Sequence, residues 1–211
     1  EMASFEDYLA ELRDGDQPLK ATKLAHLSHL SDEQERAFRS LWPGIEVKRR
    51  RQVVRQLVEL AEDNVELNFD AVLLTCLSDD DPQVRVEAIR GLWEYDQRDL
   101  IEPLIKLLQS DMEVDVRAEA ALALGRYVLQ WEFGTLRQHY FQRVEEALRR
   151  VLDDTREKLE VRARALEAIG ACSLPWVRQV IYGAYNSRSR RLRISAIHAM
   201  GRNCDPAWLP I

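Results

Sequence analysis

Apolar and polar positions alternate along this chain with the spacing of helices. Four segments begin with an apolar residue followed by arginine, and small or apolar residues stand four, five and eight positions after the first one. Those offsets place all four positions on one stripe of an α-helix. We call these segments A helices. The clear copies begin at Val84, Val116, Val161 and Leu192, and weaker copies begin near Leu19 and Arg49.

Small residues mark each clear A helix at fixed places. An alanine at offset four lets a neighbouring helix come close. A glycine follows three of the copies at offset nine, as Gly125, Gly170 and Gly201. Glycine readily adopts the left-handed conformation that ends many helices, so we expect these three residues to be C-caps.

A second apolar helix, the B helix, follows each A helix. The clearest is "RDLIEPLIKLLQS" at residues 98–110, and the others span residues 32–42, 68–77, 140–152 and 175–185. Ser31 with Gln34 has the spacing of a capping box, and Pro175 suits a first helical turn. One helix pair cannot bury its apolar face alone, whereas stacked pairs can, which explains why the pattern recurs. No sustained alternation of period two predicts a strand.

The segment "DDPQVRVEAIRGLWEYDQRDLIEPLIKLL" resembles a HEAT repeat of the bacterial PBS-lyase HEAT-like type. The residues that match this pattern in order are Asp81, Pro82, Val84, Arg85, Ala88, Pro103 and Leu104. The copies "VRAEAALALG", "VRARALEAIG" and "LRISAIHAMG" match its first helix. The resemblance covers the chain from about residue 16 onward. It implies an all-α, right-handed α-solenoid of about six helix pairs, and it carries almost no information about activity.

The predicted organisation is an N-terminal capping helix at residues 1–15 followed by a repeat array at residues 16–211. The approximate repeats are 16–43, 44–78, 79–110, 111–155, 156–187 and an incomplete 188–211. Because the sixth copy has barely one turn of its B helix, we expect the natural array to continue beyond Ile211. Its apolar end, with Trp208, Leu209 and Ile211, would then favour self-association. The alternative is a natural short terminus that folds back over the last helix.

The fourth copy contains an unusual aromatic segment at residues 127–141. Trp131, Phe133, Tyr140 and Phe141 could form a contact with a ligand or partner. Alternatively, the A and B helices are longer in this copy and the aromatic side chains pack together. The second interpretation is favoured, because apolar residues at helical spacing usually belong to a core.

Composition and charge narrow the class of protein. The 211 residues carry a net charge of −6, which disfavours general affinity for nucleic acid. Cys76, Cys172 and Cys204 stand far apart, as reduced intracellular thiols do, so we expect a cytoplasmic protein with core cysteines. No apolar run is long enough for a membrane helix.

No motif in the chain carries recognisable catalytic or cofactor chemistry. The four histidines lack the glutamate neighbours that serve as ligands in di-iron HEAT enzymes such as deoxyhypusine hydroxylases, so we expect no metal and no cofactor. Two basic runs, Lys48–Arg55 and Arg188–Arg193, could contact phosphates. A solvated face is the favoured interpretation of both, because no aromatic residues alternate with the arginines and acidic stretches intervene.

The sequence therefore favours a non-catalytic scaffold that binds an unidentified protein on a concave face lined by B helices. The candidate contact residues, which fall off the apolar stripe, are Arg98, Glu102, Lys106, Gln142, Glu146, Arg149, Arg178, Tyr182 and Tyr185. A structural ladder is expected between repeat arginines and aspartates of the turns. Its members are Asp81, Arg85, Asp115, Arg117, Arg162 and Arg193.

Two alternative functions remain open at this point. One is nucleic-acid binding through the arginine runs, as in HEAT-like alkylpurine DNA glycosylases, although the net negative charge of the chain would repel phosphates. The other is an accessory protein of the phycobilin-lyase type, which the repeat-level resemblance suggests without carrying over any catalytic residue.

Overall fold

The fold is known from a computed structural model that describes residues 5–203 and 205–208. Within these ranges the chain forms twelve α-helices, four short 3-10 helices and no β-strand, which confirms the predicted all-α class. The capping pattern predicted around Ser31 and the N-terminal proline of residues 175–185 are also confirmed. Cys204, Leu209 and Ile211, which entered the predictions of core thiols and of an apolar end, lie outside the described residues.

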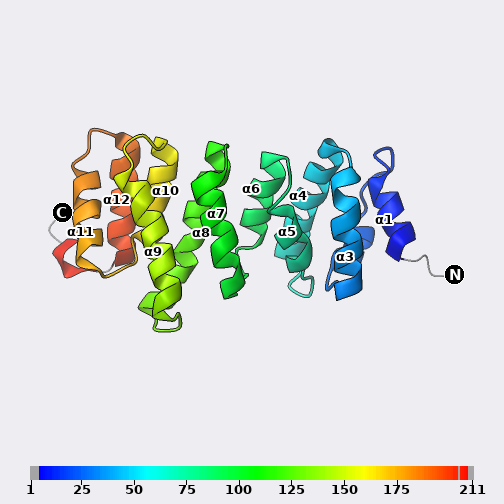
Figure 1. Cartoon of the computed structure of the whole chain (residues 1–211), viewed down its shortest axis with the longest axis horizontal. Coiled ribbons are helices and arrows are strands. Elements are labelled where there is room, and N and C mark those ends of the chain that lie inside the picture. The colour runs from blue at the N-terminus through cyan, green and yellow to red at the C-terminus, as the bar shows by residue number, and fades with distance from the viewer. Residues whose placement is uncertain (1–4, 204, 209–211) are drawn as a thin grey trace. The chain divides into compact units, whose positions relative to one another are not determined.

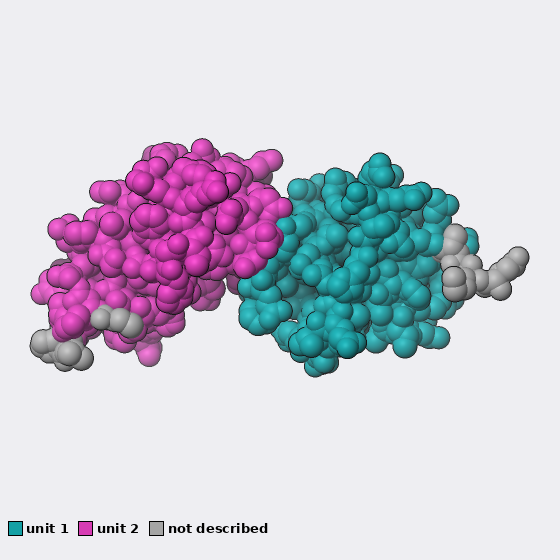
Figure 2. Space-filling model, turned by 90° about the horizontal axis from the view of Figure 1, so that it is seen from below, with its two compact units in different colours: residues 1–95 teal, residues 96–211 magenta. Residues whose placement is uncertain are grey.

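The helices fall into two compact units, residues 1–95 and 96–211, each shown in its own colour in Figure 2. The boundary lies within the third predicted repeat. Unit 1 contains α1 (Phe5–Arg13), α2 (Ala21–Leu24), α3 (Asp32–Leu41), α4 (Val47–Asp63), α5 (Asp70–Cys76) and α6 (Pro82–Gly91). Unit 2 contains α7 (Ile101–Ser110), α8 (Val114–Glu132), α9 (Gln138–Asp153), α10 (Leu159–Ile169), α11 (Pro175–Tyr185) and α12 (Arg190–Asn203).

Unit 1 is built on helix pairs that follow the predicted periodicity. The predicted N-terminal helix corresponds to α1, which buries Tyr8, Leu9 and Leu12 and packs against α3. In the first copy the A helix is short, because α2 has four residues and continues only as a 3-10 turn at Ala25–Leu27. Further along, α4 packs against α6, and α5 packs against both α3 and α6.

Unit 2 consists of two layers of helices (Figure 1). The A helices α8, α10 and α12 pack side by side, and the B helices α7, α9 and α11 cover them on one side. The layers share a core in which Val116, Leu124, Val144, Val161 and Ile181 have no exposed surface. The predicted apolar stripes therefore face this interface.

The aromatic segment is part of this packing. Helix α8 runs on to Glu132, and the Trp131 ring stacks on Phe141 of α9 with centroids 4.5 Å apart and an interplanar angle of 5°. Tyr127 is fully buried and donates to the Gln97 carbonyl at 2.7 Å. The longer helices and their stacked aromatics match the favoured interpretation, although Phe133 is 77% exposed.

The prediction of C-caps is wrong for Gly125 and Gly201, whereas Gly170 is the C-cap of α10 but lacks the expected left-handed conformation. Gly125 lies inside α8 and Gly201 inside α12, while Gly170 has a right-handed φ of −55°. Among the described glycines, only Gly134 has a positive φ, of +73°. The left-handed conformation is therefore not what these three positions require.

At two of these positions glycine instead allows neighbouring A helices to approach closely. A Cβ added to Gly125 would lie 3.1 Å from the Cα of Ala168 in α10, and one added to Gly170 would lie 2.7 Å from the Cβ of Ala199 in α12. Glycine of one repeat thus meets alanine of the next. This seam holds the A helices of unit 2 at their spacing, and it leaves no room for a larger residue.

The ladder arginines act differently from the prediction. Three of them, Arg85, Arg117 and Arg193, donate from Nη1 to two backbone carbonyls in the turn before their own helix, five and six residues back. The turn keeps its shape because the side chain six residues back accepts from the backbone N–H two positions later. The contacts are Arg85 with Asp79 and Asp80, Arg117 with Asp111 and Met112, and Arg193 with Ser187 and Arg188, at 2.7–3.1 Å.

Arg162 departs from this rule, and the ladder prediction is wrong for it. Its side chain makes no hydrogen bond to any described residue, and its Nε is buried without a partner. The residue six positions earlier is Arg156, whose guanidinium can only donate and so cannot fold the turn in the same way. The aspartate predicted for the fourth repeat, Asp115, is exposed at the start of α8.

The ion pairs between repeats use different partners from those predicted. Arg51 of α4 binds both carboxylate oxygens of Asp81, the N-cap of α6, at 2.9 and 2.5 Å. In unit 2, Arg117 binds both oxygens of Glu157 at 3.1 and 2.9 Å. In each case the guanidinium binds the acidic residue just before the next A helix, which is 30 or 40 positions further along the chain. Such bidentate pairs fix geometry as well as charge.

A partly buried charge network joins α10 and α12. Arg191 binds both oxygens of Glu160 at 2.8 and 2.9 Å, and it reaches Glu167 at 2.8 Å. Burial alone would raise the pKa of Glu167, but hydrogen bonds from Ser195, Arg191 and Arg164 lower it below its usual value. Both carboxylates of the network are therefore ionised at neutral pH.

A glycine-to-alanine substitution at the seam should cost stability. In Gly170→Ala the new Cβ would collide with the backbone and side chain of Ala199, so α12 must shift. We expect the free energy of unfolding to fall by about 1–3 kcal/mol. The matched control is Gly183→Ala in α11, where an added Cβ meets no atom within 4 Å and helix propensity should raise stability by about 0.5–1 kcal/mol. Urea denaturation of both variants measures the difference, and equal stabilities would contradict the seam.

Removal of the Arg117 side chain should also destabilise the protein. The Arg117→Ala variant removes the guanidinium that donates to Glu157 and to two turn carbonyls, and only 15% of the Arg117 side chain is exposed. We expect a loss of about 1–3 kcal/mol at pH 7. The control Arg150→Ala breaks a pair with Glu146 in which both side chains are 65% exposed, so it should cost less than about 0.5 kcal/mol.

The effect of Arg117→Ala should depend on pH in a defined direction. Burial would raise the pKa of Glu157, but the hydrogen bonds from Arg117 and from the Lys158 amide lower it overall. A carboxylate with a lowered pKa stabilises the fold fully above the unfolded value of about 4.3, and this contribution disappears as the pH falls through the folded value. The difference in unfolding free energy between wild type and variant should therefore narrow as the pH falls below about 4, to the part that the turn carbonyls contribute. A gap that stays constant down to pH 3 would show that the ion pair contributes nothing.

Candidate functional site

All the predicted contact residues lie in unit 2, on the B helices and the 3-10 turn before α7. Most are exposed, and only Tyr185 is half-buried. Arg98, Glu102 and Lys106 come from the first of these segments, Gln142, Glu146 and Arg149 from α9, and Arg178, Tyr182 and Tyr185 from α11. We refer to the exposed side of α7, α9 and α11 as the B face.

Side chains from adjacent B helices contact one another across the B face. Arg143 of α9 donates to Glu102 of α7 at 2.7 Å, and the guanidinium of Arg98 lies 5.8 Å from the centre of the Tyr140 ring. These contacts connect residues about 41 positions apart. They hold Glu102 and Arg98 in place on an otherwise open surface.

The contact between α9 and α11 centres on Trp176. Its indole N–H donates to Glu145 at 2.8 Å, and the guanidinium of Arg149 lies 5.0 Å above its ring. Sequence reasoning missed Arg143, Glu145 and Trp176. The available signal was spacing by one repeat: Glu145 and Trp176 stand 31 positions apart, as do other residues that meet between neighbouring repeats.

The charges of the B face compensate one another locally. Arg150 pairs with Glu146 at 2.7 Å on α9, and Arg178 pairs with Asp205. Tyr182, by contrast, keeps 56% of its surface exposed beside these charges. The B face therefore offers mixed polar groups and an open aromatic ring, a combination suited to a polypeptide more than to a polyanion.

Five of the eight arginines in the two basic runs have partners within the protein, and for these the favoured interpretation of a solvated face is wrong. The exposed arginines, which fit that interpretation, are Arg55, Arg188 and Arg190. Arg49 and Arg50 are 4% and 5% exposed. Arg50 lies 3.0 Å from Asp79 through Nε and donates to the Ile45 carbonyl at 2.7 Å. In the second run, Arg191 belongs to the network between α10 and α12. The run spacing could not reveal this, because the acidic partners lie about one repeat away.

Neither a metal-binding group nor a reactive thiol is found among the described residues. Within them, no group of three or more His, Cys, Asp and Glu side chains is placed to hold a metal ion. Cys76 and Cys172 are buried free thiols, and burial raises the pKa of Cys172 to about 12. Burial also raises the pKa of Cys76, so neither sulfur is a ready nucleophile. None of the described helices is both long and apolar enough to span a membrane.

Comparison with known proteins agrees with the repeat architecture. A family model for HEAT repeats matches residues 71–156. No curated protein matches the chain significantly in sequence. Solved structures match a larger part of the chain, and the two described next are 18% and 19% identical to it.

Two solved structures illustrate these matches. A designed armadillo repeat protein in complex with the peptide (KR)4 is similar over 95% of this chain and 100% of its own, with a TM-score of 0.53 and 18% identity. The complex of CpcE and CpcF of phycocyanin lyase from Nostoc sp. PCC7120 is similar over 80% of this chain and 99% of the matched one, with a TM-score of 0.53 and 19% identity. At such identities the likeness concerns the fold alone. Residues 71–156 are similar to HEAT repeats, and the chain has the helical-repeat fold of HEAT and armadillo solenoids.

Proposed function

We propose that this chain is a non-catalytic interaction module that binds a protein partner through the B face of unit 2. The observation that carries the proposal is a surface on which exposed polar and aromatic side chains are held in place by contacts between α7, α9 and α11. A surface whose side chains are already ordered loses little conformational entropy on binding.

The repeat fold supports this proposal, because HEAT and armadillo arrays commonly bind proteins. The designed armadillo neighbour is in complex with a peptide, and CpcE and CpcF form a complex with each other. The B face offers a mixed set of contacts to such a partner. Its exposed aromatic ring, Tyr182, has the character of an interface anchor, since tyrosine often contributes most of the energy of an interface.

The two alternative functions have less support. Nucleic-acid binding through the arginine runs would need free guanidinium groups, whereas Arg50, Arg51 and Arg191 are bound to carboxylates. A role like that of a phycobilin lyase rests on a likeness at 19% identity, which transfers no residue. Self-association at the C-terminal end stays a prediction, for which Ile194 and Ile197 of α12, 50% and 57% exposed, are the relevant side chains. A cytoplasmic location is also a prediction and rests on the free cysteines.

A photo-crosslinking experiment tests the B face. With benzoylphenylalanine in place of Tyr182, we expect one polypeptide to be crosslinked in extracts of the source organism, and Tyr182→Ala should weaken its binding roughly 10- to 30-fold. The matched control position is Glu113, an exposed residue in the turn before α8, where crosslinking should be absent and alanine should change affinity less than about twofold.

Two outcomes would contradict the proposal. Crosslinking from Glu113 but not from Tyr182 would place the partner elsewhere. Sub-micromolar binding of a DNA duplex near physiological salt, with an affinity that falls steeply as salt rises, would favour the nucleic-acid alternative.

A further inference from the structure

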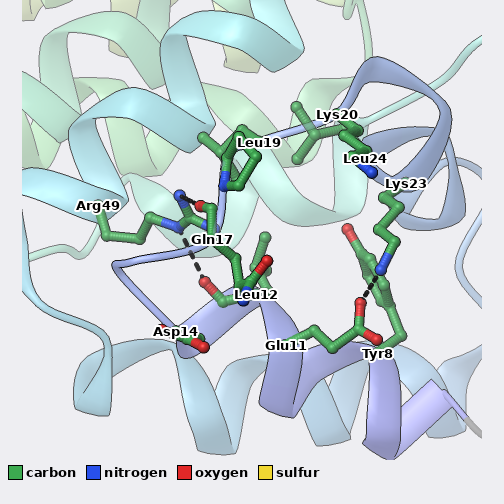
Figure 3. A pocket seen from close by; sticks show the side chains of 11 residues that line it. Tyr8, Glu11, Leu12, Asp14, Gln17, Leu19, Lys20, Lys23, Leu24 and Arg49 are labelled. Atoms are coloured by element: carbon green, nitrogen blue, oxygen red, sulfur yellow. Dashed lines mark hydrogen bonds and ion pairs between the residues drawn. The ribbon is translucent and has the colours of Figure 1, made fainter.

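A pocket of about 280 Å³ opens in unit 1 between α1, the loop at residues 14–20, α2 and the start of α4 (Figure 3). It has no connection with the B face, and the proposed function does not use it. Its polar lining includes two deeply buried groups: a guanidinium without a carboxylate partner and a hydroxyl without a hydrogen-bond partner in the described residues. Both are hydrogen-bond donors, and one is a cation.

The cation is Arg49, which is 4% exposed. Its Nε donates to the Leu12 carbonyl at 3.0 Å and its Nη1 to the Gln17 carbonyl at 2.8 Å. No carboxylate in the described part of the chain pairs with it, and its Nη2 makes no hydrogen bond there. The next two residues, Arg50 and Arg51, each bind an aspartate. A buried guanidinium without a counter-charge is costly, so Arg49 stands out from its own run.

The second group is the Tyr8 hydroxyl. Only 9% of Tyr8 is exposed, and its hydroxyl is buried without a hydrogen-bond partner in the described residues. Buried tyrosine hydroxyls usually find a partner. Burial raises the pKa of Tyr8, and the nearby charge of Arg49 offsets this only in part. The hydroxyl therefore stays protonated at neutral pH and can donate.

The remaining charges leave the pocket with surplus positive charge. Lys23 is paired with Glu11, and Figure 3 shows this pair with Tyr8 on the side of the pocket opposite Arg49. Asp14 accepts a hydrogen bond from the amide of Asp16 at 3.0 Å. The lining thus holds three cationic and two acidic side chains. Its apolar walls are Leu12, Pro18, Leu19 and Leu24.

We propose that this pocket binds a carboxylate carried on a small apolar stem, with Arg49 as the charge partner and Tyr8 as a second donor. The free Nη2 of Arg49 can donate to a carboxylate oxygen, and charge-assisted hydrogen bonds of this kind are the strong ones. The apolar walls accommodate the stem. A volume of about 280 Å³ lies near the lower end of the range for small-molecule sites, so the occupant is a single small acid or the last residue of a polypeptide.

Calorimetry with a pair of matched probes tests this assignment. N-acetyl-leucine carries the carboxylate, and N-acetyl-leucinamide has the same stem without the charge. We expect the acid to bind with a dissociation constant at least roughly tenfold lower than that of the amide. Equal binding of both probes, or binding of neither the acid nor the peptide described below, would overturn the proposal.

A conservative variant separates ligand binding from structure. Because the Tyr8 hydroxyl has no partner within the described fold, Tyr8→Phe should keep or raise the melting temperature. The same variant should weaken binding of the acid roughly three- to tenfold. Tyr182→Phe, an exposed tyrosine of unit 2, is the control and should change neither value. Unchanged affinity in Tyr8→Phe would also overturn the proposal.

The source of the carboxylate is decided by a third probe. A six-residue peptide that ends in leucine with a free carboxylate is compared with its amidated form. Tighter binding of the free peptide than of N-acetyl-leucine identifies a polypeptide C-terminus as the ligand. Binding no tighter than that of N-acetyl-leucine identifies a small organic acid, and either result supports the carboxylate site.

Discussion

The close approach of A helices is the constraint on which the arrangement of unit 2 depends. Gly125 against Ala168 and Gly170 against Ala199 leave no space for a side chain between successive helices. The helices can come so near only because backbone meets backbone or alanine at these points. That spacing then sets where α7, α9 and α11 lie, and so which residues of neighbouring B helices can touch. The contacts of Trp176 with Glu145 and Arg149 follow from it.

Arginine fixes the register that the seam alone would leave open. An apolar interface tolerates sliding, whereas a bidentate ion pair has one geometry. Arg51 with Asp81 and Arg117 with Glu157 each join an A helix to the beginning of the next one. Arg117 also binds the carbonyls of the turn before its own helix, so a single side chain orders a turn and a junction. Packing thus sets the spacing of the A helices, and the ion pairs set their register.

The sequence predicted the helices well because their signal is local. Apolar offsets of four, five and eight define a stripe whatever lies against it, and capping at Ser31 needs only Gln34 three residues on. The partners of the arginines were beyond such reasoning, because Asp81 and Glu157 lie a repeat away and the turn carbonyls leave no trace in side-chain patterns. The glycines misled for a related reason. A glycine near a helix end suggests a left-handed cap, and only the position of Ala199 shows that Gly170 is needed for the close approach of α10 and α12.

Departures from the repeat rules identify the positions where something other than packing acts. Most arginines at the starts of A helices are satisfied by a carboxylate or by turn carbonyls, so an arginine that is not satisfied requires a separate cause. For Arg162 the cause is visible in the sequence. The side chain six residues back is Arg156, which cannot accept the backbone hydrogen bond that shapes the turn in the other repeats. Arg49 donates to the carbonyls of Leu12 and Gln17, but no carboxylate within the described fold balances its buried charge. It lines the same pocket as the Tyr8 hydroxyl, a buried donor without a partner in the described residues, and the two together indicate a group that the described chain does not supply. A repeat protein offers this test wherever one copy breaks a rule that its neighbours keep.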